Sequence, residues 1–367
     1  MFHISPSMAK PKLFSPGPVD VASETYAAMC GPTIGHRGAD FEELYASLQP
    51  GLQEIAGTSR GVFLNTSSAW GIMEGSLRNL TQKKVLNLCC GAFSDKWFSV
   101  AKSCGKEAEK IQVEWGQPID PKAVRAKLAE GGFDTITLVH NETSTGCLNP
   151  LKEIAAVVRE FDDVLLITDT VSSFSAVPIP FDELGIDVLL CGVQKAVALP
   201  PGLSLFIASE RALERASTQS DRGYYFDFLE FQKNHEKNNT PSTPAIPHLY
   251  GLKERVDHML TEGMENRYRR HEETNALLQE WAAGHGFENL APEGFRSKSL
   301  GCFKTPDNLD LSGWIKAVRN NHGFLINGGY GKIKGTTFRI SNMGNETVET
   351  MRELFAALDE ELPKFQS

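Results

Sequence analysis

Short apolar runs alternate along the first half of the chain with longer stretches of helical spacing. The runs are typical of strands buried on both faces of a parallel sheet, because they lack the polar alternation of a half-exposed strand. They cover residues 61–64, 85–89, 135–139, 164–167 and 188–191. The helical stretches cover residues 40–55, 71–80, 95–104, 121–129 and 151–160. This order predicts an α/β fold with a mostly parallel mixed sheet flanked by helices.

The pattern changes after Pro241. Residues 247–263 and 265–283 have the length and spacing of two long helices, and the segment from about residue 287 mixes strands with helices. We therefore expect an N-terminal arm over residues 1–20, a large domain over residues 21–255 and a small C-terminal α+β domain over residues 256–367. A chain of 367 residues is long enough for this division.

Composition narrows the class of protein. The formal net charge is −9 without a long run of one sign, which argues against nucleic-acid binding. No apolar stretch is long enough to span a bilayer, and residues 1–12 lack the apolar segment of a secretory signal, so we expect a cytoplasmic protein. The seven cysteines form no CxxC pair and the nine histidines no HExxH motif. These spacings predict neither a disulfide framework nor a catalytic metal.

Two of the predicted strands end in residues with acid–base chemistry. Asp169 follows one apolar run and Lys195 lies just beyond another. Taken alone, a strand-end aspartate is as well explained by the capping of a turn, and most lysines are solvated. Lys195, however, is followed by Ala196 and not by charged residues, and desolvation makes a lysine amine a usable nucleophile. Parallel sheets bind ligands outside the carboxyl ends of their strands, where both residues are expected.

As a pair, the two residues match the needs of pyridoxal phosphate. This cofactor requires a lysine for a Schiff base and a carboxylate that keeps the pyridine nitrogen protonated. It also requires phosphate donors, ideally at a helix N-terminus. Ser68, Ala69 and Trp70 follow a predicted strand and open a helix. A lone serine there more often caps the helix, but within this set we interpret Ser68 and the two following amides as phosphate ligands.

Several blocks of the sequence resemble the class V aminotransferases. This group of fold-type I enzymes, which depend on pyridoxal phosphate, includes the alanine–glyoxylate and serine–glyoxylate aminotransferases. The blocks occur in the expected order at residues 14–19, 35–37, 140–146, 192–195, 200–202 and 338–345. The resemblance covers nearly the whole chain. It implies pyridoxal 5'-phosphate as the cofactor, small amino-acid and 2-oxo-acid substrates, and a homodimer with composite active sites.

The resemblance also implies a role for each matching residue. Lys195 forms the Schiff base and moves a proton between substrate and cofactor, while Asp169 pairs with the pyridine nitrogen. Arg339 and the backbone near Gly17 hold the substrate carboxylate, since arginine offers a planar bidentate geometry. The other cofactor contacts are Val171 and Phe93 on the two ring faces, Thr143 at the phenolic oxygen, Gln194 at the phosphate, and Thr243 at the phosphate of the partner subunit.

The substrate stays open between two subgroups. Residues 36–41 also resemble phosphoserine aminotransferases, in which His36 and Arg37 match residues that hold the substrate phosphate. Residues 338–345 are closer to the glyoxylate group. We therefore predict transfer from alanine or serine to glyoxylate or pyruvate by a ping-pong mechanism, with phosphoserine and 2-oxoglutarate as the alternative. Lys332 and Lys334 could attract an anionic substrate, although a solvated loop is the commoner explanation.

Two further readings rank lower. Cysteine desulfurases share the fold but usually carry histidines where Phe93 and Gln194 stand. A protein of this fold that binds partners without catalysis is expected to lack Lys195 or Asp169, and both are present.

Overall fold

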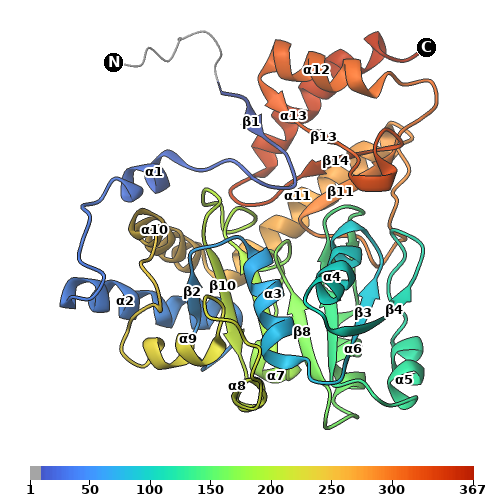
Figure 1. Cartoon of the computed structure of the whole chain (residues 1–367). Helices are drawn as coiled ribbons and strands as arrows, with labels where there is room; N and C mark the ends of the chain where they lie inside the picture. The colour runs from blue at the N-terminus through green and yellow to red at the C-terminus, as the bar shows by residue number, and fades with distance from the viewer. Residues whose placement is uncertain (1–9) are drawn as a thin grey trace.

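A seven-stranded sheet forms the centre of the larger part of the molecule (Figure 1). The computed structural model describes residues 10–367, so residues 1–9 of the predicted arm lie outside the described residues. The strands are β2 (Phe63–Asn65), β3 (Lys84–Cys89), β4 (Glu107–Gln112), β5 (Thr135–Val139), β8 (Leu165–Asp169), β9 (Val188–Gly192) and β10 (Ser204–Ala208). Their order is β2-β10-β9-β8-β5-β3-β4. The strand β10 runs antiparallel to its neighbours β2 and β9, and the other neighbouring strands pair in parallel, so the predicted α/β fold with a mostly parallel sheet is confirmed.

The apolar runs in the sequence do not predict two strands of this sheet, β4 and β10. The edge strand β4 has the sequence Glu-Ala-Glu-Lys-Ile-Gln and is largely exposed, so it lacks an apolar run. The strand β10 is fully buried and apolar, but it follows directly on the turn at residues 200–202. The chain reverses at this turn, so β10 runs antiparallel to β9.

Helices cover both faces of the sheet and bury two separate cores. One face carries α2 (Ala39–Ala56), α5 (Pro121–Ala129), α6 (Leu151–Val158), α7 (Phe181–Leu184) and α10 (Ile246–Glu262). The other face carries α3 (Ala69–Leu80), α4 (Ala92–Ser103), α8 (Glu210–Ser217) and α9 (Phe228–His235). Successive strand residues enter opposite cores, as Leu166 and Ile167 do. Because both faces are covered, the inner strands β5, β8 and β9 are buried along their whole length.

The C-terminal elements form a second layer around a third core (Figure 1). They are α11 (Met264–Gly284), β11 (Leu300–Lys304), α12 (Leu311–His322), β12 (Phe324–Leu325), β13 (Asn327–Gly328), η1 (Gly331–Ile333), β14 (Thr337–Ser341), α13 (Val348–Glu361) and η2 (Leu362–Lys364). The sheet order is β11-β14-β13. The short strand β1 (Lys12–Leu13) pairs with β12, and Phe14 is buried in the third core. The described end of the predicted arm therefore packs on the C-terminal layer.

Three short elements complete the fold, namely α1 (Ser23–Met29), β6 (Asn141–Glu142) and β7 (Cys147–Leu148). The predicted boundary at residues 255 and 256 lies inside α10, which packs on α1 and α2. The division into an arm and two domains stays a prediction. No helix within residues 10–367 combines the length and the apolar character needed to cross a membrane.

Candidate active site

A cavity of about 240 Å³ lies beside the carboxyl ends of β5, β8 and β9. Segments far apart in the sequence line it, from the N-terminal arm to the turn after β9. Many of the residues predicted to bind cofactor or substrate lie on its wall. They are Gly17, Ala69, Trp70, Phe93, Thr143, Asp169, Val171, Gln194 and Lys195.

Lys195 is buried in the turn that follows β9. Its side chain is 8% exposed, and Nζ donates a hydrogen bond to the carbonyl oxygen of Pro16. Desolvation lowers the pKa of the amine to about 8, and the positive charge of Arg339 acts in the same direction. The free base is therefore available near neutral pH.

Two buried arginines hold the backbone that follows Lys195. Arg267 of α11 donates to the carbonyl oxygen of Ala196, and Arg255 of α10 donates to that of Val197 at 3.0 Å. Both guanidinium groups are at most 1% exposed. The sequence pattern does not predict these contacts, because the arginines lie on helices well beyond the lysine along the chain.

Asp169 is the last residue of β8 and is 7% exposed. Its two carboxylate oxygens accept different hydrogen bonds. The backbone N–H of Val171 donates to Oδ1 at 3.0 Å, and the indole N–H of Trp97 donates to Oδ2 at 3.0 Å. Burial raises the pKa of the carboxyl group to about 6, while the two hydrogen bonds oppose this rise.

The N-terminus of α4 is held by the fully buried carboxylate of Glu142. Its oxygens accept from the backbone N–H of Phe93 at 3.3 Å and of Ser94 at 2.9 Å. They also accept from the hydroxyl groups of Ser94 at 3.0 Å and Ser144 at 2.6 Å. This cap positions Phe93 at the cavity. Glu142 lies inside one of the blocks that carry the family resemblance, yet its type and place alone predict no role.

Arg339 of β14 in the C-terminal layer does not line the cavity, but it contacts Thr143, which does. Its Nη1 donates to the carbonyl oxygen of Thr143 at 3.3 Å, and Nε and Nη2 donate to that of Gly328 at 3.3 Å. The ring of Tyr330 lies 5.7 Å from the guanidinium carbon and stacks on Phe93 at a centroid distance of 5.3 Å. Tyr330, for which the sequence pattern predicts no role, thus contacts both Arg339 and Phe93.

Three predicted site residues lie together away from the cavity wall. His36 Nε2 is 3.4 Å from the hydroxyl oxygen of Thr243. The guanidinium of Arg37 donates to the side-chain oxygen of Asn239 at 2.8 Å and to the carbonyl oxygens of Thr240 and Pro241 at 2.8 and 3.1 Å. None of His36, Arg37 and Thr243 lines the cavity.

The remaining predicted residues also lie off the wall. Ser68 is the N-cap of α3, and its side chain makes no capping hydrogen bond. Lys332 packs its ammonium group 4.3 Å from the centroid of the Trp115 ring, and Lys334 is exposed. Neither lysine lines the cavity.

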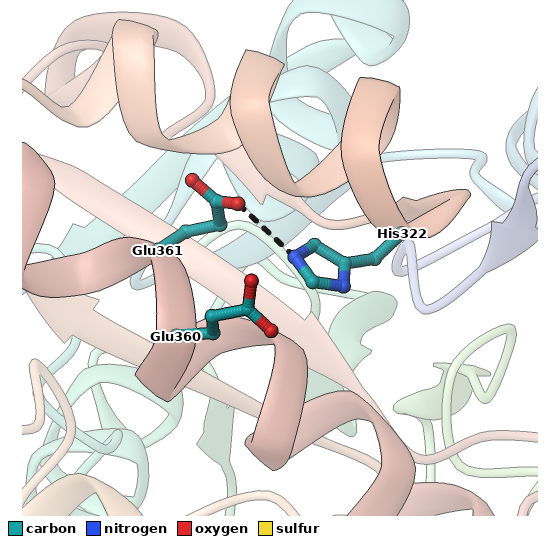
Figure 2. Close-up of side chains that lie close together, drawn as sticks. All are labelled: His322, Glu360 and Glu361. Carbon is teal, nitrogen blue, oxygen red and sulfur yellow. Dashed lines mark hydrogen bonds and ion pairs between the residues drawn. The ribbon is translucent and has the colours of Figure 1, made fainter.

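A cluster in the C-terminal layer brings possible metal ligands together (Figure 2). His322 of α12 lies beside Glu360 and Glu361 of α13, with ligand atoms within 4.8 Å of one another. Oε1 of Glu361 already accepts from His322 at 3.1 Å, from Asn321 at 2.9 Å and from Lys364 at 3.1 Å. The buried carboxylate of Glu361 therefore already has hydrogen-bond donors from neighbouring side chains. None of the three residues of the cluster lines the cavity.

Comparison with known proteins identifies the family. Residues 75–308 match the family model described as Aminotransferase class-V. The chain belongs to the class V aminotransferases. It is 36% identical over 340 residues to an uncharacterised aminotransferase of Methanocaldococcus jannaschii, which covers 91% of this chain and 88% of that protein. It is 31% identical over 350 residues to a serine–glyoxylate aminotransferase of Methylorubrum extorquens, covering 91% and 86%. The solved alanine–glyoxylate aminotransferase of Nostoc sp. superimposes with a TM-score of 0.92 at 27% identity, covering 97% of each chain.

The cofactor of this aminotransferase is pyridoxal phosphate, and the cavity residues fit that group. Oδ1 of Asn141 is buried at the cavity without a hydrogen-bond donor, so a bound ligand can supply one. Gly17 has a φ of +108°, and a Cβ at this position would overlap the side chain of Lys195. Glycine therefore leaves space for the lysine amine to turn toward a ligand.

Proposed function

We propose that this aminotransferase moves the amino group of alanine or serine to glyoxylate or pyruvate. The observation that carries the proposal is the similarity, over nearly the whole chain, to proteins named serine–glyoxylate and alanine–glyoxylate aminotransferase. The cavity of about 240 Å³ beside Arg339 supports a small substrate with a carboxylate group.

When bound, pyridoxal phosphate supplies an electron sink that stabilises the negative charge left after the substrate Cα loses its proton. Lys195 would hold the cofactor through its side-chain amine and would be released when the substrate amine takes its place. Burial lowers the pKa of this amine to about 8, so it would then serve as the base that takes the proton from Cα of the substrate. Asp169 would pair with the pyridine nitrogen, and Arg339 would orient the substrate carboxylate. The second substrate would use the same residues in the reverse order, in a ping-pong mechanism.

The cofactor contacts that the family resemblance implies belong to the same proposal. Val171 and Phe93 would lie against the ring, Thr143 at the phenolic oxygen, and Ser68, Ala69, Trp70 and Gln194 at the phosphate. We also propose a homodimer in which Thr243 of one subunit completes the phosphate site of the other. The exposure of Thr243 in the single chain supports this arrangement. The cytoplasmic location stays a prediction.

The alternative donor is phosphoserine, with 2-oxoglutarate as acceptor. This reading requires His36 and Arg37 to hold the substrate phosphate. The guanidinium of Arg37 instead donates to three oxygens of residues 239–241, which favours the smaller donor. A desulfurase is disfavoured because Phe93 and Gln194 line the cavity at positions where histidines are usual in those enzymes.

The near-visible absorbance of the protein loaded with pyridoxal phosphate tests the proposal. Alanine, serine and phosphoserine are added separately, and each mixture then receives glyoxylate, pyruvate or 2-oxoglutarate. We expect alanine or serine to remove the yellow absorption fastest, and glyoxylate or pyruvate to restore it. Fastest loss with phosphoserine would select the alternative, whereas no change with any donor would contradict both.

Lys195→Ala provides the test of the lysine. The variant is expected to bind pyridoxal phosphate without turnover, because it lacks both the covalent link and the proton carrier. Steady-state transamination by this variant would refute the role of Lys195.

A further inference from the structure

Trp97 supplies the only side-chain hydrogen bond to Asp169 within residues 10–367. It lies on α4, its side chain is 1% exposed, and its indole N–H donates to Oδ2 of Asp169 at 3.0 Å. The other carboxylate oxygen accepts from the backbone of Val171 at 3.0 Å. Each oxygen thus has its own donor. Because the terminal torsion of an aspartate is otherwise broad, two donors on different oxygens fix the plane of the carboxylate.

The position of Trp97 follows from the helix that carries it. Phe93 and Trp97 are four residues apart on α4 and therefore share one face of the helix. Phe93 lines the cavity, while Trp97 packs in the core beneath it with Val139, Ile167 and Leu190. The first turn of α4 is held by Glu142. One rigid helix therefore sets both the wall of the cavity and the donor to Asp169.

We propose that Trp97 is the positioning residue for Asp169, whose indole N–H orients the carboxylate toward the pyridine nitrogen and holds it as an anion. This inference rests on the proposed role of Asp169 in the bound enzyme. It assigns a function to a core tryptophan that does not line the cavity.

The hydrogen bond from the neutral indole of Trp97 is one of several influences on the ionisation of Asp169. Burial and the negative charge of Glu142 raise the pKa of the carboxyl group, and the charge of Lys195 lowers it. The hydrogen bond from Trp97 also lowers it. The indole N–H therefore acts in the same direction as the charge of Lys195 and the backbone N–H of Val171, and all three favour the ionised form of Asp169. Without the indole, more of the carboxyl group is protonated near pH 6, and the protonated form cannot pair with a pyridinium.

The first experiment measures the binding of pyridoxal phosphate to cofactor-free Trp97→Phe at pH 8.5 and pH 6.5. At pH 8.5 the dissociation constant is expected to rise about tenfold, as for the loss of one hydrogen bond to a charged group. At pH 6.5 the ratio of variant to wild type is expected to be larger still, because the pKa of Asp169 rises in the variant. The protonation of the phosphate affects both proteins alike and cancels in this ratio. The charge of Asp169 raises the pKa of Lys195, so the amine is titrated separately in each protein. An unchanged constant, or a ratio equal at both pH values, would overturn the proposal.

Trp314→Phe is the matched control. Trp314 is fully buried in the third core, and its indole donates to the carbonyl oxygen of Leu358 at 3.2 Å. The same chemical change at this position is expected to leave cofactor affinity unaltered at both pH values. A similar weakening in the control would show that loss of core packing explains the result, and the proposal would fall.

A second measurement does not depend on how Trp97→Phe folds. The indole N–H resonance of Trp97 in the cofactor-free protein is expected to shift with pH around 6 and to lose this dependence in Asp169→Asn. An indole resonance that shifts neither with pH nor on the substitution of Asp169 would overturn the inference. Asp169→Asn also distinguishes a failure of the proposed role of Asp169 from a failure of the inference about Trp97. If it leaves cofactor binding intact, the proposed role of Asp169 fails; if it weakens binding while Trp97→Phe does not, only the inference fails.

Discussion

Lys195 and Asp169 are ionisable side chains that the fold removes from water at one cavity. Burial lowers the pKa of the first to about 8 and raises that of the second to about 6. Neither forms a salt bridge with another residue in the described part of the chain. Shifted pKa values in a cavity are typical of functional sites, since a structural charge is normally paired when it is buried.

Arg339 allows a prediction about substrate binding. Arg339→Ala removes a charge-assisted contact to the substrate carboxylate, so KM for the amino acid is expected to rise about 100-fold. Steady-state kinetics with alanine and serine measure the change. Arg319→Ala, at an exposed position of α12, serves as the control and should leave KM unaltered. An unchanged KM in Arg339→Ala would place the carboxylate contact elsewhere.

At the scale of single elements, α4 depends on a carboxylate from outside the helix. Glycine occupies its N-cap position, so no side chain of the cap residue can accept from the first turn. Glu142 of the short strand β6, which follows β5, takes this part. The helix that carries Phe93 and Trp97 is thus held at its N-terminus by the β6 segment.

Glu142→Gln tests this dependence. The amide nitrogen cannot accept a hydrogen bond, so some of the donors now bound to Glu142 lose their partner inside the protein. We expect the free energy of unfolding to fall by about 3 kcal/mol, as for other buried groups deprived of a charged partner. Urea unfolding measures the loss. Glu109→Gln is the control, because Glu109 lies at the exposed edge strand β4 and its ion pairs with Lys84 and Lys127 are solvated. Equal losses in the two variants would contradict the capping role.

At the scale of the whole molecule, the cavity exists only where distant segments meet. Gly17 comes from the N-terminal arm, which is anchored by the pairing of β1 with β12. Arg339 comes from the C-terminal sheet and contacts Thr143. Arg255 and Arg267 tie the two long helices to the backbone after Lys195. The C-terminal layer therefore contacts the backbone near the cavity at two places, through Arg267 at Ala196 and through Arg339 at Thr143.

The burial of Lys195 should reduce the stability of the cofactor-free protein. Its pKa is about 8 in the folded state against an ordinary value of 10.5, so between these values the unfolded chain binds more protons. Stability of the wild type therefore rises from pH 8 to pH 10.5, by about 3 kcal/mol for this group. Lys195→Met lacks this titration. It is expected to be more stable than the wild type at pH 7, with an advantage that shrinks as the pH rises through this range.

Urea unfolding of the cofactor-free proteins at pH 7, 9 and 10.5 checks this expectation. Lys316→Met, at an exposed position of α12, is the control and should show no pH-dependent difference. A Lys195→Met variant less stable than wild type at pH 7 would contradict the expected cost of burying the amine.

The proposed homodimer gives a prediction about assembly. Sedimentation is expected to give twice the chain mass of 40.4 kDa. Thr243→Ala is expected to keep this mass while weakening the binding of pyridoxal phosphate about fivefold, because one hydrogen bond to the phosphate is lost. A monomer with full cofactor affinity would contradict the composite site.

Residue patterns predicted those parts of the fold that depend on local sequence. The apolar runs identify β3, β5, β8 and β9, and the helical spacing identifies α2, α3, α5 and α6. The strand ends that carry Asp169 and Lys195 also follow from these runs, because parallel strands end at one edge. The edge strand β4 was missed because half-exposed strands can be polar. The sequence pattern also did not predict the residues that support the site without lining it, namely Trp97, Glu142, Arg255 and Arg267. Each of them contacts a residue that is distant in the sequence.

The sequence by itself determined the α/β class, the family, the cofactor, and the candidate lysine and carboxylate. The class follows from periodicity, the two candidate residues from their types at strand ends, and the family from the blocks that resemble class V aminotransferases. Only the tertiary structure decided that Trp97 and Val171 share the two oxygens of Asp169, that Arg37 holds residues 239–241, and that Tyr330 joins Arg339 to Phe93. The physical reason is that hydrogen bonds and ring contacts depend on distances of a few ångström between segments, and such distances are set by the packing of layers and not by spacing along the chain.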